Sequence, residues 1–266
     1  MNGLSEQPMQ HCSVEVRGRI WIVTIRRPEV RNAIHRPASL ELEAVFNRFE
    51  ADPQAWVAVL TGEGDQAFCA GNDLKYQAEG HDTTMPPTGF GGITARFARE
   101  KPIIAAVNGL AMGGGFEIAL ACDLMIAAEH AVFALPEPRV GLAAVAGGLL
   151  RLPRQIPLKQ AMGMILTGRR VSAAEGLSMG FVNEVAQTGK ALEAALRWAD
   201  MILEGSPVAL RAAKEIVERG LEAPSVEAIY HQQRSLPAVT ALYNSADRVE
   251  GPKAFAQKRK PVWTGS

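Results

Sequence analysis

Short apolar runs between glycine- and proline-containing loops occupy the first two thirds of the chain. Such runs are typical of buried strands, and they cover residues 20–26, 56–60, 103–107, 124–127 and 132–133. Residues 13–17 precede the first run across Gly18-Arg19, which predicts a hairpin. The segment 67–74, AFCAGNDL, predicts a strand that ends in a glycine turn and continues into a helix.

Apolar residues at helical spacing predict helices in most of the remaining chain. These helices cover residues 39–51, 158–166, 191–203, 207–219, 225–243 and 247–259. Ser172 begins another helix, with Glu175 at capping-box spacing. Residues 27–38, which hold Pro28 and Pro37, predict a loop. The order of elements predicts an α/β fold of βαβ units, with a core over residues 1–200 and a helical region over residues 201–266.

A glycine-rich run, KPIIAAVNGLAMGGGFEIALACD at residues 101–123, is the centre of this pattern. Gly113, Gly114 and Gly115 lead into an apolar helix over residues 116–122, so a ligand can approach the backbone closely and meet the free N–H groups of the helix start. The helix N-terminus carries about half a positive charge, which suits an oxygen that becomes negative. Glu117 follows Gly114 by three residues and should lie on the same side of the first turn. The alternative is a helix packed tightly on a strand, in which Glu117 complements the helix dipole.

The run matches neither nucleotide fingerprint, because it contains no GxGxxG and no Lys-Ser/Thr after the glycines. A glutamate at the helix start would also repel a phosphate. An uncharged group that acquires negative charge, such as a thioester carbonyl, fits better.

The charge balance and the cysteine pattern exclude several classes of function. Lys+Arg and Asp+Glu are equal at 28 each, so no net field favours nucleic acid or an anionic membrane. Cys12, Cys69 and Cys122 cannot all pair and form no CxxC, which indicates a reducing compartment and no structural zinc. The apolar segment 102–122 is interrupted by Asn108, glycines and Glu117, so it is not a membrane span. Residues 1–10 are polar and predict no signal peptide; we expect a soluble, cytoplasmic protein.

A second carboxylate, Glu137, lies between Pro136 and Pro138 in the loop 135–142. A carboxylate among Ala, Leu and Pro loses solvation, so its pKa should rise toward the range useful for proton transfer. Glu117 and Glu137 could then divide the work, one activating water and the other delivering a proton to carbon. Alternatively, the two glutamates have no catalytic role, because many proteins carry glutamates in such places. Likewise, AFCAGNDL could be a plain strand–turn–helix with Asp73 as a helix cap.

Five blocks in order resemble the enoyl-CoA hydratase/isomerase (crotonase) family, from about Val14 to the C-terminus. They are RRPEVRNAI (residues 26–34), AFCAGNDL, the glycine-rich run, FALPEPRVGL (residues 133–142) and LTGRRVSAAEGLSMGFVNEV (residues 166–185). Residues 150–157 and 250–263 are similar to the carnitinyl-CoA dehydratase branch. The resemblance implies a spiral of ββα units with two sheets, and C-terminal helices that form a homotrimer or a hexamer.

The resemblance also implies an acyl-CoA thioester substrate, with no metal ion and no cofactor besides the coenzyme A of the substrate. Its oxygen would accept hydrogen bonds from the backbone N–H groups of Asn72 and Gly114, which form an oxyanion hole. Both glutamates of the hydratases are present, so Glu117 would activate water and Glu137 would exchange the proton at the α-carbon. The positions that match substrate- and CoA-binding positions are Val30, Ala33, Ala70, Gly71, Asp73, Leu74, Gly113, Pro136, Gly141, Phe255 and Lys258. Phe255 and Lys258 would come from a neighbouring subunit, although a lysine on a terminal helix is otherwise simply solvated.

The chain departs from the common hydratases at two places. Asn72 replaces a small residue, which changes the pocket shape but not the backbone N–H. Residues 142–150, LAAVAGGLL, make a more apolar wall than usual, which disfavours a trimethylammonium group. The sequence therefore predicts an enoyl-CoA hydratase, with an isomerase, a carnitinyl-CoA dehydratase or a non-catalytic acyl-CoA- or RNA-binding homologue as alternatives. Residues 79–92, rich in Gly, Pro and Thr, are predicted to be a flexible insertion, and the sequence does not decide whether it closes over the ligand.

Overall fold

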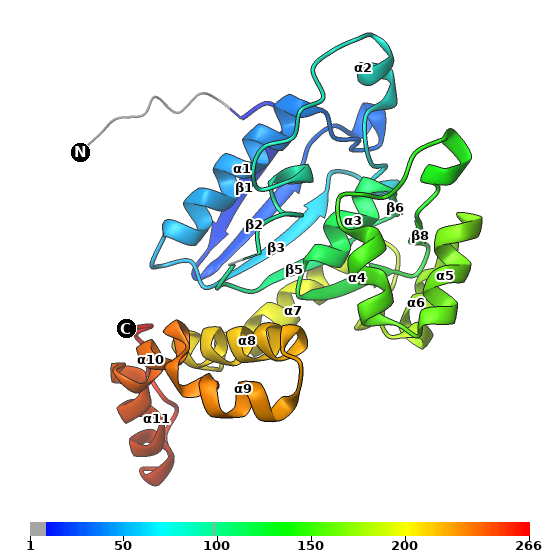
Figure 1. The fold of residues 1–266 in the computed structure, drawn as a ribbon. Helices are drawn as coiled ribbons and strands as arrows, with labels where there is room; N and C mark the ends of the chain where they lie inside the picture. The colour runs from blue at the N-terminus through cyan, green and yellow to red at the C-terminus, as the bar shows by residue number, and fades with distance from the viewer. Residues whose placement is uncertain (1–8, 98) are drawn as a thin grey trace.

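A computed structural model describes residues 9–97 and 99–266 of the chain (Figure 1). The first eight residues lie outside the described residues. They include the start of the predicted core and most of the segment for which no signal peptide is predicted. Among the helices of the described part, none combines the length and the apolar character needed to cross a membrane.

The larger sheet has six strands in the order β1-β2-β3-β5-β7-β10. β1 and β2 form the predicted antiparallel hairpin, and the other neighbours are parallel. The strands are Cys12–Arg17 (β1), Ile20–Ile25 (β2), Val57–Gly62 (β3), Ile103–Val107 (β5), Leu124–Ala128 (β7) and Glu184–Ala186 (β10). Both faces of the central strands are covered, which explains why their sequences are continuously apolar instead of alternating.

Two hydrophobic clusters cover opposite faces of this sheet. Trp21, Val23 and Ile25 pack into the cluster that contains helix α1 (Arg36–Ala51), whereas Ile20 and Ile22 pack against α7 (Ala191–Leu203). Figure 1 shows α1 and α7 on either side of the sheet. Alternate residues of β2 thus point to opposite faces, as the period of a strand requires.

The smaller sheet has four strands in the order β4-β6-β8-β9. β4, β6 and β8 are parallel to one another, and β9 is antiparallel to β8. The strands are Ala67–Cys69 (β4), Leu110–Met112 (β6), Val132–Ala134 (β8) and Val171–Ser172 (β9). Among these, β6 and β9 were not predicted: β6 lies inside the glycine-rich run directly after Asn108-Gly109, and β9 has only two residues.

The remaining helices follow the predicted order with some differences. The core holds α2 (Leu74–Ala78), α3 (Gly114–Ala121), α4 (Gly148–Gln155), α5 (Leu158–Thr167) and α6 (Ala173–Met179), with 3₁₀ helices η1 (Pro28–Val30), η2 (Phe90–Gly92) and η3 (Glu137–Val140). Ser172 and Glu175 form the predicted capping box of α6. α4, which was not predicted, contains Pro153. α1 begins inside the predicted loop, because proline is compatible with the first helical turn and His35 caps the helix.

The C-terminal region is helical, as predicted, and lies below the core in Figure 1. It comprises α8 (Pro207–Glu222), α9 (Val226–Gln232), η4 (Gln233–Ser235), α10 (Pro237–Tyr243) and α11 (Ala246–Ala256). The single helix predicted over 225–243 is broken before Pro237, which disfavours helical backbone in the residue before it. α7 crosses the predicted boundary at residue 200 and ends at Leu203, and the division into two domains stays a prediction.

Candidate active site

Three adjacent parallel strands bring the candidate residues together. β4 ends just before the loop of Asn72, β6 ends before Gly113 and Gly114, and β8 ends before Glu137. The N–H of Gly113 donates to the carbonyl of Ala134 at 2.9 Å, which ties the end of β6 to the end of β8. Ligands in α/β sheets bind at the carboxyl ends of the strands, so the topology predicts a site at this edge.

The two proposed oxyanion-hole donors lie on neighbouring loops. A Cβ atom placed on Gly71 would lie 3.2 Å from the nitrogen of Gly114 and 2.6 Å from the carbonyl oxygen of Met112, so only glycine permits this approach. Gly71 also has a φ of +95°, which glycine adopts without strain. The loop of Gly71, which leads into Asn72, therefore lies close against the start of α3.

The N–H groups of Asn72 and Gly114 point away from the backbone hydrogen bonds that their own segments form. Ile34 donates to the carbonyl of Gly71 and accepts from the N–H of Asp73, so the parallel bridge between Ile34 and Asn72 leaves the Asn72 N–H facing the other way. Gly114 is the first residue of α3, where an N–H has no partner within the helix. Asn72 and Gly114 line one cavity.

Glu117 is buried in the first turn of α3, with 3 % of its surface exposed. Its Oε1 accepts a hydrogen bond from the N–H of Gly148 at 2.8 Å. A Cβ on Gly148 would lie 3.1 Å from that oxygen, so a glycine lets the backbone come this close. Burial raises the pKa of Glu117 to about 7; the charge of Glu137 adds to the rise, while the hydrogen bond from Gly148 and the charge of Arg151 oppose it.

Glu137 begins η3 and faces the start of α3 from the neighbouring strand end. A Cβ on Gly113 would lie 2.7 Å from its Oε1, and among the described residues no group donates a hydrogen bond to its buried Oε2. Burial raises the pKa of Glu137 above its usual value. A carboxyl group that is buried, has a raised pKa and keeps a free oxygen is suited to proton transfer.

The cavity that contains both glutamates has a volume of about 1680 Å³. Besides the residues above, it is lined by the predicted positions Ala70, Gly71, Leu74, Gly113 and Pro136. Leu142, Val145 and Leu150 of the predicted apolar wall also line it, and all three side chains are exposed. The cavity continues past Glu117 to residues of α8 such as Leu221.

The other predicted binding positions lie outside the lining of this cavity. Val30 and Ala33 lie in and after η1, Asp73 forms an ion pair with Arg27, and Gly141 ends η3 with a φ of +73°. Phe255 is 86 % exposed on α11, and Lys258 follows that helix. Their roles toward coenzyme A stay predictions, including the contribution of Phe255 and Lys258 to a neighbouring subunit.

Sequence reasoning did not identify two residues that shape the site. Phe90 of η2 is buried and packs against Gly114, where a Cβ would lie 2.5 Å from the ring. Gly148 holds Glu117 from the start of α4. The pair Gly147-Gly148 is a signal for the second residue, but nothing near Phe90 in the sequence indicates its contact with a helix 24 positions further on.

Comparisons with known proteins were made on the sequence and on the fold. Residues 15–266 match the profile of the family described as enoyl-CoA hydratase/isomerase. The chain is 44% identical over 252 residues to the carnitinyl-CoA dehydratase of Escherichia coli (strain K12), covering 93% of this chain and 96% of that protein. The carnitinyl-CoA dehydratase of Salmonella typhi is equally similar over the same lengths.

Solved structures share the fold over nearly the whole chain. The crystal structure of an enoyl-CoA hydratase from Mycobacterium tuberculosis H37Rv superimposes with a TM-score of 0.90 at 40% identity, covering 96% of this chain and 99% of that one. The carnitinyl-CoA hydratase of Mycobacterium avium gives a TM-score of 0.77 at 42% identity, covering 97% and 100%. These similarities confirm the predicted fold class.

Proposed function

This chain belongs to the enoyl-CoA hydratase/isomerase family, and from that premise we propose that it adds water reversibly to the 2,3 double bond of an acyl-CoA thioester. One observation carries the proposal: the buried carboxyl group of Glu117 and the half-buried one of Glu137, both with raised pKa values, line one cavity beside two backbone N–H groups. An isomerase moves a proton between two carbons and needs one such group. Two groups suit the addition of both parts of a water molecule.

In the proposed reaction, ionised Glu117 accepts a proton from water as the water oxygen bonds to C3. The π electrons move toward the thioester, whose oxygen gains negative charge. The N–H groups of Asn72 and Gly114 donate to that oxygen, and such donors act most strongly on charge that develops in the transition state. Protonated Glu137 delivers its proton to C2. The hydroxyl and the proton are thus added, and one proton passes from Glu117 back to Glu137 before the next turnover.

The mechanism requires no metal ion, and coenzyme A enters as part of the substrate. An aliphatic acyl chain is favoured by Leu142, Val145 and Leu150, which line the cavity. Apolar side chains cannot form the polar contacts that a charged acyl group requires once it leaves water. A second candidate is the dehydration of carnitinyl-CoA, which the names of relatives at 44% identity support. The two candidates share the chemistry and differ in the acyl group.

The test follows the absorbance of the conjugated enoyl thioester: its loss when the purified protein meets crotonyl-CoA or crotonobetainyl-CoA, and its gain when the protein meets a 3-enoyl-CoA. We expect hydration of crotonyl-CoA with the highest kcat/KM. A higher kcat/KM for crotonobetainyl-CoA would assign the protein to the second candidate. Conversion of the 3-enoyl-CoA alone would make it an isomerase, and binding without any conversion would contradict catalysis.

The pH dependence of hydration should follow the raised pKa of Glu117. The proposed reaction needs Glu117 ionised, so kcat/KM should fall below a pH of about 7, by roughly tenfold for each further unit. It also needs Glu137 protonated, so kcat/KM should fall again at higher pH as Glu137 loses its proton. Glu137 interacts with Glu117, so the observed midpoint belongs to the pair. The measurement is a pH–rate profile with crotonyl-CoA.

Unfolding at acid pH would not imitate this effect. A carboxyl group whose pKa is raised in the folded state contributes more stability as the pH falls from about 7 toward its unfolded value of 4.5. The thermal midpoint should therefore hold while kcat/KM declines. A profile that stays flat between pH 5 and 7 would contradict the role of Glu117.

A further inference from the structure

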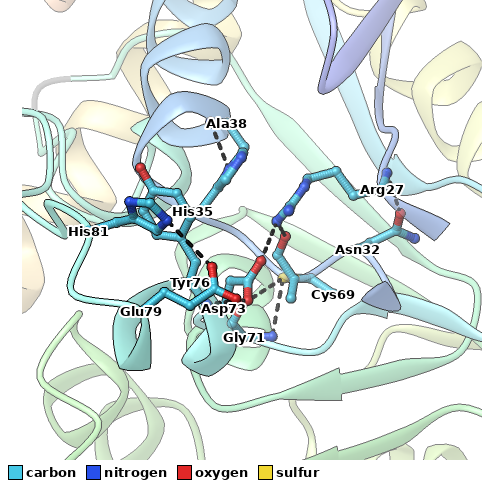
Figure 2. Close-up of polar contacts among 11 residues, drawn as sticks. Arg27, Asn32, His35, Ala38, Cys69, Gly71, Asp73, Tyr76, Glu79 and His81 are labelled. Carbon is cyan, nitrogen blue, oxygen red and sulfur yellow. Dashed lines mark hydrogen bonds and ion pairs between the residues drawn. The ribbon is translucent and has the colours of Figure 1, made fainter. Parts of the chain in front are cut away.

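An ion pair between Arg27 and Asp73, shown in Figure 2, joins two neighbouring loops. Nη1 of Arg27 donates to Oδ2 of Asp73 at 3.0 Å and to the carbonyl oxygen of Ala33 at 2.5 Å. The two charged side chains are only 12 % and 10 % exposed. One guanidinium nitrogen thus bridges the loop that follows η1 and the loop that carries Asn72.

Asp73 uses its two oxygens for two different partners. Oδ2 accepts from Arg27, and Oδ1 accepts from the N–H of Tyr76 at 3.1 Å, which caps α2. Burial alone would raise the pKa of Asp73, but the Tyr76 N–H and the Arg27 guanidinium hold the pKa below its usual range. The carboxylate therefore stays ionised and paired at neutral pH.

Backbone hydrogen bonds transmit this pairing to Asn72. Ala70 donates to Arg31, Ile34 donates to Gly71, and Asp73 donates to Ile34, at 2.8 to 3.0 Å. Asn72 lies between the last two of these bonds. Its N–H can keep its direction toward the cavity only while both loops keep their relative position.

The partner loop, residues 31–34, follows η1 and is held by side chains as well as by backbone hydrogen bonds. Arg31 and Asn32 have φ values of +54° and +56°, which few residues other than glycine adopt. The Asn32 side chain is buried, accepts from the N–H of Arg27 at 3.0 Å and donates to the carbonyls of Glu63 and Ala67. Arg27 therefore contacts this loop through its backbone and through its guanidinium.

We propose that Arg27 is a positioning residue for catalysis, which fixes the Asn72 N–H of the oxyanion hole through its bridge between Asp73 and Ala33. The proposal rests on the proposed function. Neither side chain lines the cavity, so neither contacts the reacting atoms. Its consequence is that losing the bridge weakens the hydrogen bond to the thioester oxygen, whereas substrate binding changes little.

The structure also separates this role from capping. Asparagine is as good an N-cap as aspartate, so Asp73→Asn keeps the bond to the Tyr76 N–H and loses the charge that faces Arg27. Arg27→Met removes the bridge and keeps much of the apolar stem. Arg27→Lys retains one charged nitrogen without the planar guanidinium. Arg26→Met is the matched control, because Arg26 adjoins Arg27 but forms an exposed pair with Glu63 at 3.6 Å.

The experiment measures the infrared stretch of the thioester carbonyl in a saturated acyl-CoA, labelled with ¹³C at that carbon, when it binds the full-length protein. A hydrogen bond to the carbonyl lowers this frequency. In parallel, kcat and KM are measured with crotonyl-CoA. The frequency describes bound ligand only, so a smaller folded fraction changes the amplitude and not the position of the band.

We expect the wild-type protein and Arg26→Met to show the same shift to lower frequency. Arg27→Met and Asp73→Asn should lose about half of the shift or more, with kcat reduced roughly 10- to 100-fold, as for a misplaced group at the site. KM should stay nearly unchanged in Arg27→Met, whereas Asp73, a predicted CoA-binding position, is judged by the frequency and kcat. Arg27→Lys should recover part of both. If Arg27→Met does not fold, Asp73→Asn, which keeps the cap, decides the question.

Two negative results are distinguishable. A wild-type protein that shows no carbonyl shift would overturn the oxyanion hole and with it the proposed function. A full shift in Asp73→Asn and Arg27→Lys, with the wild-type shift present, would overturn the positioning role alone.

Discussion

Glu137→Gln should lower kcat for hydration by about 10²- to 10⁴-fold, the usual contribution of a general acid or base. The amide has the shape of the carboxyl group but cannot deliver a proton to C2. The change breaks no hydrogen bond recorded for the described residues at Oε2, and the neutral amide is easier to bury than a carboxylate. Stability should therefore stay nearly unchanged while activity falls, as measured by absorbance with crotonyl-CoA and by thermal unfolding.

Two further variants show whether the loss of activity is specific to the two catalytic carboxyl groups. Glu193→Gln alters an exposed carboxylate of α7, which is paired with Lys190, and should leave kcat unchanged. Glu117→Gln keeps an oxygen that can accept from the Gly148 N–H, so it should fold and yet lose hydration to a similar degree. Retention of more than about a tenth of the wild-type kcat in Glu137→Gln would contradict its role as the proton donor.

Gly114→Ala should reduce kcat by about 100-fold, close to the loss of one oxyanion-hole donor. The added Cβ would lie 2.5 Å from Cε1 of Phe90, which is inside van der Waals contact. Gly114 begins α3 in a backbone conformation open to alanine, so the ring is the obstacle. Either Phe90 moves into the cavity or the Gly114 N–H moves away from the thioester oxygen. Steady-state kinetics with crotonyl-CoA measure the loss.

The controls for this change come from the same fold. Gly163→Ala lies in α5 with nothing within 4 Å of the new atom, so it should retain kcat and raise the free energy of unfolding by about 0.5–1 kcal/mol. Combining Gly114→Ala with Phe90→Ala removes the obstacle and should restore most of the lost kcat. If the double variant stays as slow as Gly114→Ala, the contact with Phe90 is not the cause.

Much of the fold was predictable because the signals are local. The hairpin, the buried strands and the capping box of Ser172 and Glu175 each depend on residues close together in the sequence. The same is true of Gly114 and Glu117, which one helical turn places on the same side. The break before Pro237 also has a local signal, the proline itself, which the apolar periodicity of residues 225–243 masks. Short elements such as β6 form through neighbouring strands, and their three residues predict nothing alone.

The site also combines features that local sequence signals predict with features that only the tertiary structure determines. The sequence alone predicted the glycine-rich turn, the position of Glu117 beside it and the proline-flanked Glu137. The resemblance added Asn72, which stays a prediction, and the family, which the comparisons confirm. Only the tertiary structure decided that β4, β6 and β8 end side by side, that Phe90 packs against Gly114, that Gly148 donates to Glu117 and that Arg27 pairs with Asp73. Those facts depend on contacts between segments far apart in the sequence, and burial exists only once the chain has folded around a group.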